Sequence, residues 1–392
     1  MAQLNFTLDM DNLKDSVMNS NIDSIVKSTI VLVLNEYMEN ERDEYLKAAA
    51  YERSDNRIDY RNGYYEREYT MSLGKLKLKV PRTRQGDFSP SVFEKYARCD
   101  QALVLSMLEM VVNGVSTRKV TKVVEQLCGE SVSKSFVSSL TMKLDPVVKE
   151  WANRPLNTKY YPYLLADAMY IKVREHHRVV SKAVYIAFGL DDEGHREIIG
   201  LQVDHNESFK SWSAFFSSLI ARGLQSPNLV VSDAHEGLKK AIQQCFVGTS
   251  WQRCTVHFKR NIVEALPKKN SEEAISLLKS LFATEDMDSL RSLKELFFRK
   301  YEGETKYEKA LKILDEGFED SIQYMNFPIF HRKHIRTTNS VERMNREIRR
   351  REKVIGIFPN TQSAFRLIGA TLMSYTETNT QWKRKLFTKT KS

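Results

Sequence analysis

The 392-residue sequence has few cysteines and no long apolar run. Its four cysteines are scattered, which argues against a disulfide framework and makes a reducing cytoplasm the expected compartment. No apolar stretch approaches the length of a membrane-spanning helix, so we expect no membrane partner. The first residues, MAQLNFTLDMDNLKD, lack a basic segment followed by an apolar one, which argues against a secretory signal.

Acidic residues outnumber basic ones only at the start of the chain. The net charge is +10, yet residues 1–60 contain 6 Lys/Arg and 12 Asp/Glu, a net of −6. The rest of the chain therefore carries +16, a charge that suits a polyanion such as DNA. Basic charge alone is also common in proteins that bind no nucleic acid. The length predicts two or three domains.

The N-terminal part predicts a long helix followed by a basic strand pair. Apolar residues recur at helical spacing over residues 24–49, and this helix could pack on a partner subunit or within its own chain. Asn62-Gly63 predicts a turn. The alternation in KLKLKV, residues 75–80, predicts a strand with one lysine face. The candidate phosphate contacts in this region are Lys75, Lys77, Arg82 and Arg84.

Residues 100–150 read as short helices with a possible helix-turn-helix. Ser116 can cap one helix, Gly129 can end it, and Ser131 or Ser133 can cap the next. Two short helices around a glycine turn are typical of a DNA-binding helix-turn-helix, although such pairs are also common without DNA. The second helix would present two candidate DNA contacts, Lys134 and Ser135.

The region from Trp151 to His257 predicts a sheet with helices inserted between its later strands. Apolar and alternating runs separated by turn signals give the order strand, strand, strand, helix, strand, helix, strand. The first three strands form an antiparallel meander. We therefore predict an α/β fold with a mixed five-stranded sheet. Residues 258–330 contain no strand pattern and read as helices.

Three acidic residues stand out by their positions. Asp167 lies inside the apolar first strand, Asp233 ends the fourth strand, and Glu342 lies one turn into a late helix. If the first and fourth strands are neighbours, the two aspartates point at one spot that the late helix can cover. A bound dication would offset the cost of burying these acids. Three oxygen ligands suit Mg²⁺ or Mn²⁺, and two such ions about 4 Å apart can drive phosphodiester chemistry.

Arginine surrounds the third acid. Residues 331–353 contain 9 Lys/Arg and 3 Asp/Glu, a net of +6. Arg346 and Arg349 follow Glu342 at helical spacing, so they share its face and could hold phosphates beside the ions. A plain surface pair between Glu342 and an arginine is the alternative, and would contribute only about 0.5 kcal/mol. The candidate DNA contacts on this helix are Arg346, Arg349 and Arg350.

Four segments in this order resemble one family. LLADAMYIKVRE, VVSDAHEGLKKAI, WQRCTVHFKRNI and RTTNSVERMNREIRRR are similar to segments of the Mutator-like transposases of bacterial insertion sequences. The resemblance implies a ribonuclease H-like catalytic core with Asp167, Asp233 and Glu342 as a DDE triad holding two Mg²⁺ or Mn²⁺ ions. It also implies cleavage of double-stranded DNA at terminal inverted repeats, strand transfer into target DNA, a circular intermediate, and a homodimer on the bacterial nucleoid.

The resemblance and the element pattern together give a division of the chain. The expected parts are a helical segment with a possible dimerisation role (1–60), a basic hairpin (61–99), a helix-turn-helix-like domain (100–150), the first part of the core (151–257), an all-helical insertion (258–330), the glutamate helix and end of the core (331–375), and a basic tail (376–392).

Cys254 and His257 form a C-x-x-H pair that recurs in the resembled family. One interpretation is a zinc half-site completed by His331 and His334. The other is a structural pair near the active site. For the whole chain, three functions stay open at this point: a transposase, a DNA-binding regulator that works through residues 100–145, and a nuclease of the same fold that cuts without joining.

Overall fold

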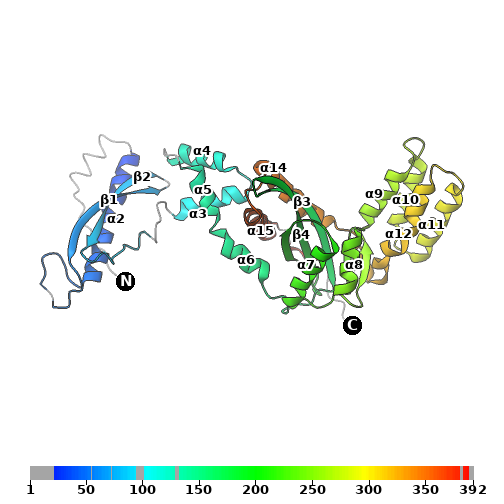
Figure 1. The fold of residues 1–392 in the computed structure, drawn as a ribbon, viewed down its shortest axis with the longest axis horizontal. Coiled ribbons are helices and arrows are strands. Elements are labelled where there is room, and N and C mark those ends of the chain that lie inside the picture. The colour runs from blue at the N-terminus through cyan, green and yellow to red at the C-terminus, as the bar shows by residue number, and fades with distance from the viewer. Residues whose placement is uncertain are drawn as a thin grey trace. The chain divides into compact units, whose positions relative to one another are not determined.

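The computed structural model describes residues 22–53, 55–71, 73–93, 101–128, 132–379 and 383–387 (Figure 1). The chain divides into two compact units, residues 1–141 and residues 142–392. The finer domain boundaries expected from the sequence stay predictions. Within the described residues, no helix combines the length and the apolarity that crossing a bilayer requires.

The first unit contains a helix packed on a two-stranded hairpin. Leu76, Leu78 and Val80 on one face of the hairpin are buried against Met38 and neighbouring apolar residues of the helix. The expected lysine face is present, because Lys75, Lys77 and Lys79 alternate with these buried residues and stay exposed. The long helix therefore packs within its own chain. The bounds of these elements are α2 Ile22–Leu46, β1 Arg61–Met71 and β2 Gly74–Thr83.

The predicted turn at Asn62-Gly63 is wrong. Both residues lie inside β1, where the pairing with β2 shifts register between Arg61 and Tyr64. Gly63 has φ of +69°, a backbone conformation that glycine adopts without strain. An irregularity of this kind adds residues to one strand, and it uses the same Asn-Gly sequence that favours hairpin turns.

The described part of the first unit also contains three short helices. Two of the predicted serine N-caps lie among the described residues, and both form their hydrogen bonds. The Ser116 hydroxyl accepts from Lys119 N–H at 3.4 Å, and the Ser133 hydroxyl accepts from Phe136 N–H at 3.0 Å. Gly129 and Ser131 lie outside the described residues. Lys134 and Ser135 are exposed at the start of the last helix. The helices are α3 Gln101–Val112, α4 Thr117–Cys128 and α5 Lys134–Thr141.

The second unit is built on the expected mixed five-stranded sheet, in the order β5-β4-β3-β6-β7. The pairs β3–β4 and β4–β5 are antiparallel, whereas β3–β6 and β6–β7 are parallel. The predicted order of strands and helices is confirmed. The elements are β3 Tyr163–Glu175, β4 Arg178–Leu190, β5 Arg196–Asp204, α7 Phe209–Ala221, β6 Leu229–Ser232, α8 Glu236–Cys245 and β7 Ser250–Arg253.

Helices cover both faces of this sheet (Figure 1). One face packs against α7 and α8, where Trp212, Phe215 and Phe216 join a fully buried cluster with alternate strand residues such as Leu164 and Ala166. On the other face α14 and α15 contact β3. Side chains alternate along a strand, so Asp167, next after Ala166, projects toward the α14 face. The covering helices are α6 Leu144–Asn153, α14 Asn339–Ile355 and α15 Thr361–Thr378.

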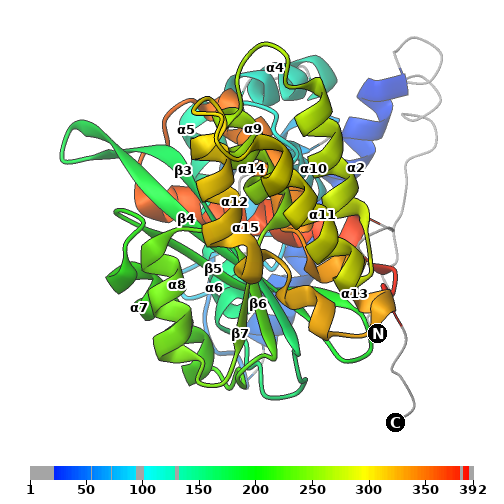
Figure 2. The ribbon, with the colours of Figure 1, turned by 90° about the vertical axis from the view of Figure 1, so that its right-hand side faces the viewer.

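Between β7 and α14 the chain is helical throughout, as the sequence predicts for residues 258–330. The helices α9 to α12 lie side by side (Figure 2), with α12 packed on α9 and α10 on α11. Their bounds are α9 Thr255–Ala265, α10 Glu272–Ala283, α11 Met287–Tyr301, α12 Glu308–Ser321, the 3-10 turn η1 Gln323–Asn326 and α13 Ile329–Ile335. Residues 380–382 and 388–392 of the expected tail lie outside the described residues.

The aromatic layer beneath α7 gives a first testable prediction. Phe216 is fully buried and packs on Trp212 and Phe246, so Phe216→Ala lowers the free energy of unfolding by about 3 to 5 kcal/mol. All four tryptophans lie in residues 142–392, so tryptophan fluorescence during urea unfolding reports on this unit. Phe209, on the same helix and 41% exposed, is the matched control, and Phe209→Ala costs less than about 1 kcal/mol. Equal losses would contradict the assigned core.

Candidate active site

The two strand aspartates lie at the same level of neighbouring strands. Leu165 of β3 pairs in parallel with Val231 of β6, and each aspartate follows its strand partner by two residues. Parallel strands run in register, so Asp167 and Asp233 come side by side where the short strand β6 ends beside β3, in the interior of the sheet. The expectation that the first and fourth strands are neighbours is confirmed.

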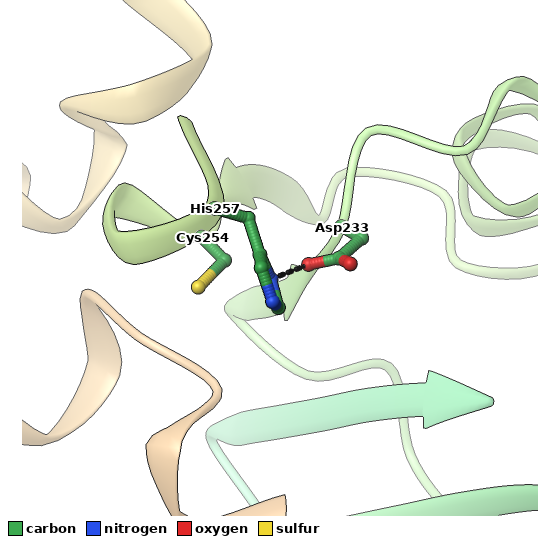
Figure 3. A group of neighbouring side chains, drawn as sticks. All are labelled: Asp233, Cys254 and His257. Atoms are coloured by element: carbon green, nitrogen blue, oxygen red, sulfur yellow. Dashed lines mark ion pairs between the residues drawn. The ribbon is translucent and has the colours of Figure 1, made fainter. Parts of the chain in front are cut away.

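A histidine joins the third acid to this pair. Nε2 of His257, in the first turn of α9, lies 3.1 Å from Oε1 of Glu342, in the first turn of α14. Nδ1 of the same ring forms an ion pair with Oδ1 of Asp233 (Figure 3). Glu342 is therefore paired with a histidine from another element, not with an arginine of its own helix as the surface-pair alternative supposed.

The imidazole of His257 carries a positive charge at neutral pH. Its hydrogen bonds, first to Asp233 and then to Cys254, raise the pKa of His257 to about 10 despite partial burial. Opposite charge favours the protonated ring, which then donates through both nitrogens. His257 thus offsets the negative charge that Asp233 and Glu342 bring together.

Asp167 is the most deeply placed of the three acids. Its Oδ1 accepts from the Ala168 N–H at 2.9 Å, and its Oδ2 accepts from Nδ2 of Asn345 at 2.8 Å. Burial, with a further contribution from the charge of Asp233, raises the pKa of Asp167 to about 7. A carboxyl group with these neighbours is costly to ionise.

Cys254 forms hydrogen bonds with the end of β6 and with the residue before α14. Its backbone N–H donates to the carbonyl of Ser232, directly before Asp233, at 2.8 Å. Its fully buried Sγ accepts from the N–H of Thr338 at 3.4 Å and from the Thr338 hydroxyl at 3.3 Å. Thr338 directly precedes α14. Burial opposes ionisation of the thiol, but hydrogen bonds from His257 and Thr338 outweigh it and lower the pKa of Cys254.

Two residues of the site were not found from the sequence. Asn345 holds Asp167, and its spacing of three residues from Glu342 on one helix was the available signal. Glu207 adds a further negative charge that raises the pKa of Asp167. Its Oε1 accepts from Nε1 of Trp212 at 3.1 Å and lies 3.7 Å from Nδ1 of His235. No sequence pattern pointed to Glu207.

The basic candidates are exposed in both units. On α14, Arg346 extends into solvent, Arg349 lies 3.5 Å from Glu352, and Arg350 lies 3.7 Å from Glu347. The hairpin and α5 of the first unit carry the remaining candidates, all of them exposed: Lys75, Lys77, Arg82, Arg84, Lys134 and Ser135.

The zinc half-site with His331 and His334 does not match the structure. Nδ1 of His331 is 2.7 Å from the Tyr163 hydroxyl, and both histidine rings pack near Phe387. Among the described residues, the group of possible metal ligands around Cys254 and His257 contains Asp233 and neither of these histidines.

Comparison with known proteins adds the family. A family model described as "Transposase, Mutator family" matches residues 1–385. The chain belongs to the Mutator family of transposases. It is 52% identical over 373 residues to the transposase for insertion sequence element IS256 in transposon Tn4001 of Staphylococcus aureus, with 95% of each chain covered. It is 40% identical over 366 residues to the transposase for ISRM5 of Rhizobium meliloti, with 93% of this chain and 90% of the relative covered.

A third relative is more distant but matches over most of its length. The transposase for IS1081 of Mycobacterium tuberculosis is 38% identical over 347 residues, covering 88% of this chain and 82% of the relative. The family resemblance read from the sequence is confirmed. Because the family match runs from residue 1 to residue 385, this Mutator-family transposase shares both of its units with the family.

The raised pKa of Asp167 predicts a gain in stability when its charge is removed. Between the ordinary value of 3.8 and about 7, the folded protein holds a proton on Asp167 that the unfolded chain has lost. Stability therefore falls as pH rises through this interval. We expect Asp167→Asn to match the wild type near pH 4 and to exceed it by about 2 to 4 kcal/mol at pH 8.

Urea unfolding in a chelator, followed by tryptophan fluorescence at each pH, measures this difference. Glu319→Gln removes an exposed carboxylate from α12 and serves as the control, with no gain expected across the range. A gain for Asp167→Asn that is the same at pH 4 and pH 8 would contradict the electrostatic origin.

Proposed function

We propose that this chain is a DDE transposase with a ribonuclease H-like core, in which Asp167, Asp233 and Glu342 are the catalytic acids. One observation carries the proposal. Asp233 at the end of β6 and Glu342 on a helix more than a hundred residues later are linked through one imidazole, and Asp167, on the neighbouring parallel strand, has a raised pKa beside them. Titratable groups perturbed by one another mark functional sites.

The donor set fits Mg²⁺ or Mn²⁺. All three groups are carboxylates, the hard oxygen ligands that these ions prefer. Asp167 is costly to ionise beside Asp233 in the protein alone, so added positive charge would favour the site. Two such ions would supply an activated water or 3′-hydroxyl and stabilise the leaving oxygen.

The protein's own groups orient this acid cluster. Asn345 donates a hydrogen bond to Oδ2 of Asp167, and the Ala168 N–H donates to Oδ1. Together these two bonds orient the Asp167 carboxyl group. His257 holds Asp233 and Glu342 from its two ring nitrogens, which fixes both carboxylates. A metal bound by Asp233 and Glu342 must compete with this imidazolium for the same oxygens. His257 is thus a positioning residue for the metal-free site.

DNA is the proposed substrate because exposed cations follow Glu342 along α14 and also lie on the hairpin and α5 of the first unit. On α14, Arg346, Arg349 and Arg350 follow Glu342 along the helix and suit phosphates held beside the acids. We assign α4 and α5 to a helix-turn-helix that presents Lys134 and Ser135 to a DNA groove. Lys75, Lys77 and Arg82 on the exposed face of β2, with Arg84 directly after the strand, add contacts to the DNA backbone.

The proposed reaction is cleavage at the terminal inverted repeats of the element and strand transfer to target DNA, through a circular intermediate. Two ends must be brought together, so the working form is at least a homodimer. The proposed site of action is the nucleoid in the bacterial cytoplasm. The supporting relatives are transposases of insertion sequence elements that match over most of both chains.

The decisive test removes the acids one at a time. Asp167→Asn, Asp233→Asn and Glu342→Gln should each lower cleavage and strand transfer by at least about 1,000-fold, equivalent to about 4 kcal/mol of transition-state stabilisation. Binding to the inverted-repeat duplex, measured by mobility shift without metal, should persist. The assay uses Mg²⁺ and DNA that flanks the element, with uncut and pre-cut ends followed separately.

A neighbouring acid provides the control. Glu236 is exposed three residues after Asp233, and Glu236→Gln should leave both reactions intact. Full activity in the Asp167, Asp233 and Glu342 variants would contradict the proposal and favour a DNA-binding regulator. A wild type that cuts DNA but cannot join a pre-cut 3′-hydroxyl end would instead favour a nuclease.

A further inference from the structure

Three different metal-binding groups meet at the start of α9. The thiol of Cys254, the imidazole of His257 and the carboxylate of Asp233 offer ligand atoms that all lie within 4.8 Å of one another. In Figure 3 the imidazole lies between the thiol and the carboxylate. The groups come from the junction of β7 with α9 and from the end of β6.

This donor set differs in kind from the carboxylate set of the proposed magnesium site. Thiolate and imidazole select borderline and soft ions such as Zn²⁺ and Cd²⁺, and Mg²⁺ has little affinity for either. Zinc binds these donors at about 2.0 to 2.3 Å, which places two ligands of one tetrahedral ion about 3.5 Å apart. The most distant pair of ligand atoms must therefore close by about 1 Å, whereas Nδ1 of His257 and Oδ1 of Asp233, which are in direct contact, must separate to admit the ion.

The protein frame around the cluster is already fixed. Cys254 and His257 are three residues apart at the first turn of α9, so they share one face. The backbone of Cys254 is bonded to Ser232, the residue before Asp233. The side chain of Asp233 is 41% exposed, which leaves a route for an ion from solvent although Cys254 itself is buried.

A second observation supports the imidazole of His257 as a metal ligand. Histidines that bind metal through one ring nitrogen usually donate the other N–H to a carboxylate, which fixes the ring. His257 has this partner, because its Nε2 is 3.1 Å from Oε1 of Glu342 while its Nδ1 faces Asp233. Three protein ligands also leave a fourth position open, the arrangement of a zinc site that can accept a further ligand.

The geometry points to a binding site for a thiophilic divalent cation, Zn²⁺ or Cd²⁺, formed by Asp233, Cys254 and His257. The cation replaces the proton on Nδ1 of His257 and the thiol proton of Cys254, and both protons leave to solvent. Binding takes Asp233 directly and leaves the Nε2 proton of His257 on Glu342. Two of the three acids assigned to Mg²⁺ are then occupied, so the cation inhibits the enzyme. The binding itself does not depend on the proposed function, whereas the inhibition rests on it.

Cadmium binding to the full-length, reduced, metal-free protein tests the site directly. The ultraviolet absorbance band from thiolate-to-cadmium charge transfer should grow until one equivalent of Cd²⁺ has been added. A large excess of Mg²⁺ should not remove the band. Cys254→Ser should abolish the band. Cys245→Ser, which changes a free cysteine of α8, should keep it. Glu342→Gln should retain the band and weaken binding by about 10- to 100-fold.

Folding of the variants is followed by tryptophan fluorescence, and His257→Gln provides a second ligand variant should Cys254→Ser fail to fold. His257→Gln should weaken cadmium binding by at least about 100-fold while the Cys254 thiol is still present. A band that persists in Cys254→Ser, or wild-type affinity in His257→Gln, would overturn the assignment, as would the absence of a band in the wild type.

Strand transfer in fixed Mg²⁺ with increasing Zn²⁺ tests the inhibition. Wild-type activity should fall in parallel with occupancy of the site. A cation that binds at the predicted ligands without inhibiting would overturn the inhibitory step and the assignment of Asp233 to Mg²⁺. No cation binding, together with loss of chemistry in Asp233→Asn, would overturn the cation site and leave the proposed function standing.

Discussion

Repulsion among closely placed carboxylates is the constraint on which the catalytic unit depends. Asp167 and Asp233 are forced to one level by the parallel pairing of β3 with β6, and Glu342 is brought to them by α14. The positive ring of His257 bonds two of these acids, while burial, with a further contribution from the charge of Asp233, lets Asp167 hold its proton to about pH 7. Placing the three carboxyl groups together lowers the stability of the folded protein and at the same time favours the binding of cations among them.

Much of this arrangement follows from local pattern. Alternation in LLADAMYI separates Asp167 from the face that holds Leu164 and Ala166, so its exclusion from the α7–α8 layer was predictable. The order of strands and helices was predictable from periodicity. The neighbouring positions of β3 and β6 entered only as a condition, because the order of elements does not determine which strands pair. The position of Glu342 one turn into an arginine-rich helix made it a candidate, and the family resemblance then implied its place beside the two aspartates.

The parts that were missed depend on contacts between distant residues. Cys254 bonds to Thr338 across 84 positions, and Asn345 bonds to Asp167 across 178. The sequence showed the C-x-x-H pair and left two interpretations open, a zinc half-site with His331 and His334 or a structural pair near the active site. In the fold, Asp233 lies beside the pair. The predicted turn at Asn62-Gly63 was wrong for a different reason. An Asn-Gly pair favours both a hairpin turn and an irregularity within a strand, and here it forms the irregularity.

The charge state of His257 tests the central claim most directly. Nitrogen-15 NMR of the histidine rings, with His257→Gln to assign the signal, follows each ring from pH 5 to pH 11 in a chelator. We predict that His257 stays doubly protonated past pH 8 and titrates near pH 10, held by Asp233 and Cys254. A ring that loses its proton near the ordinary value of 6.5 would contradict the claim that His257 neutralises the acids in the metal-free enzyme.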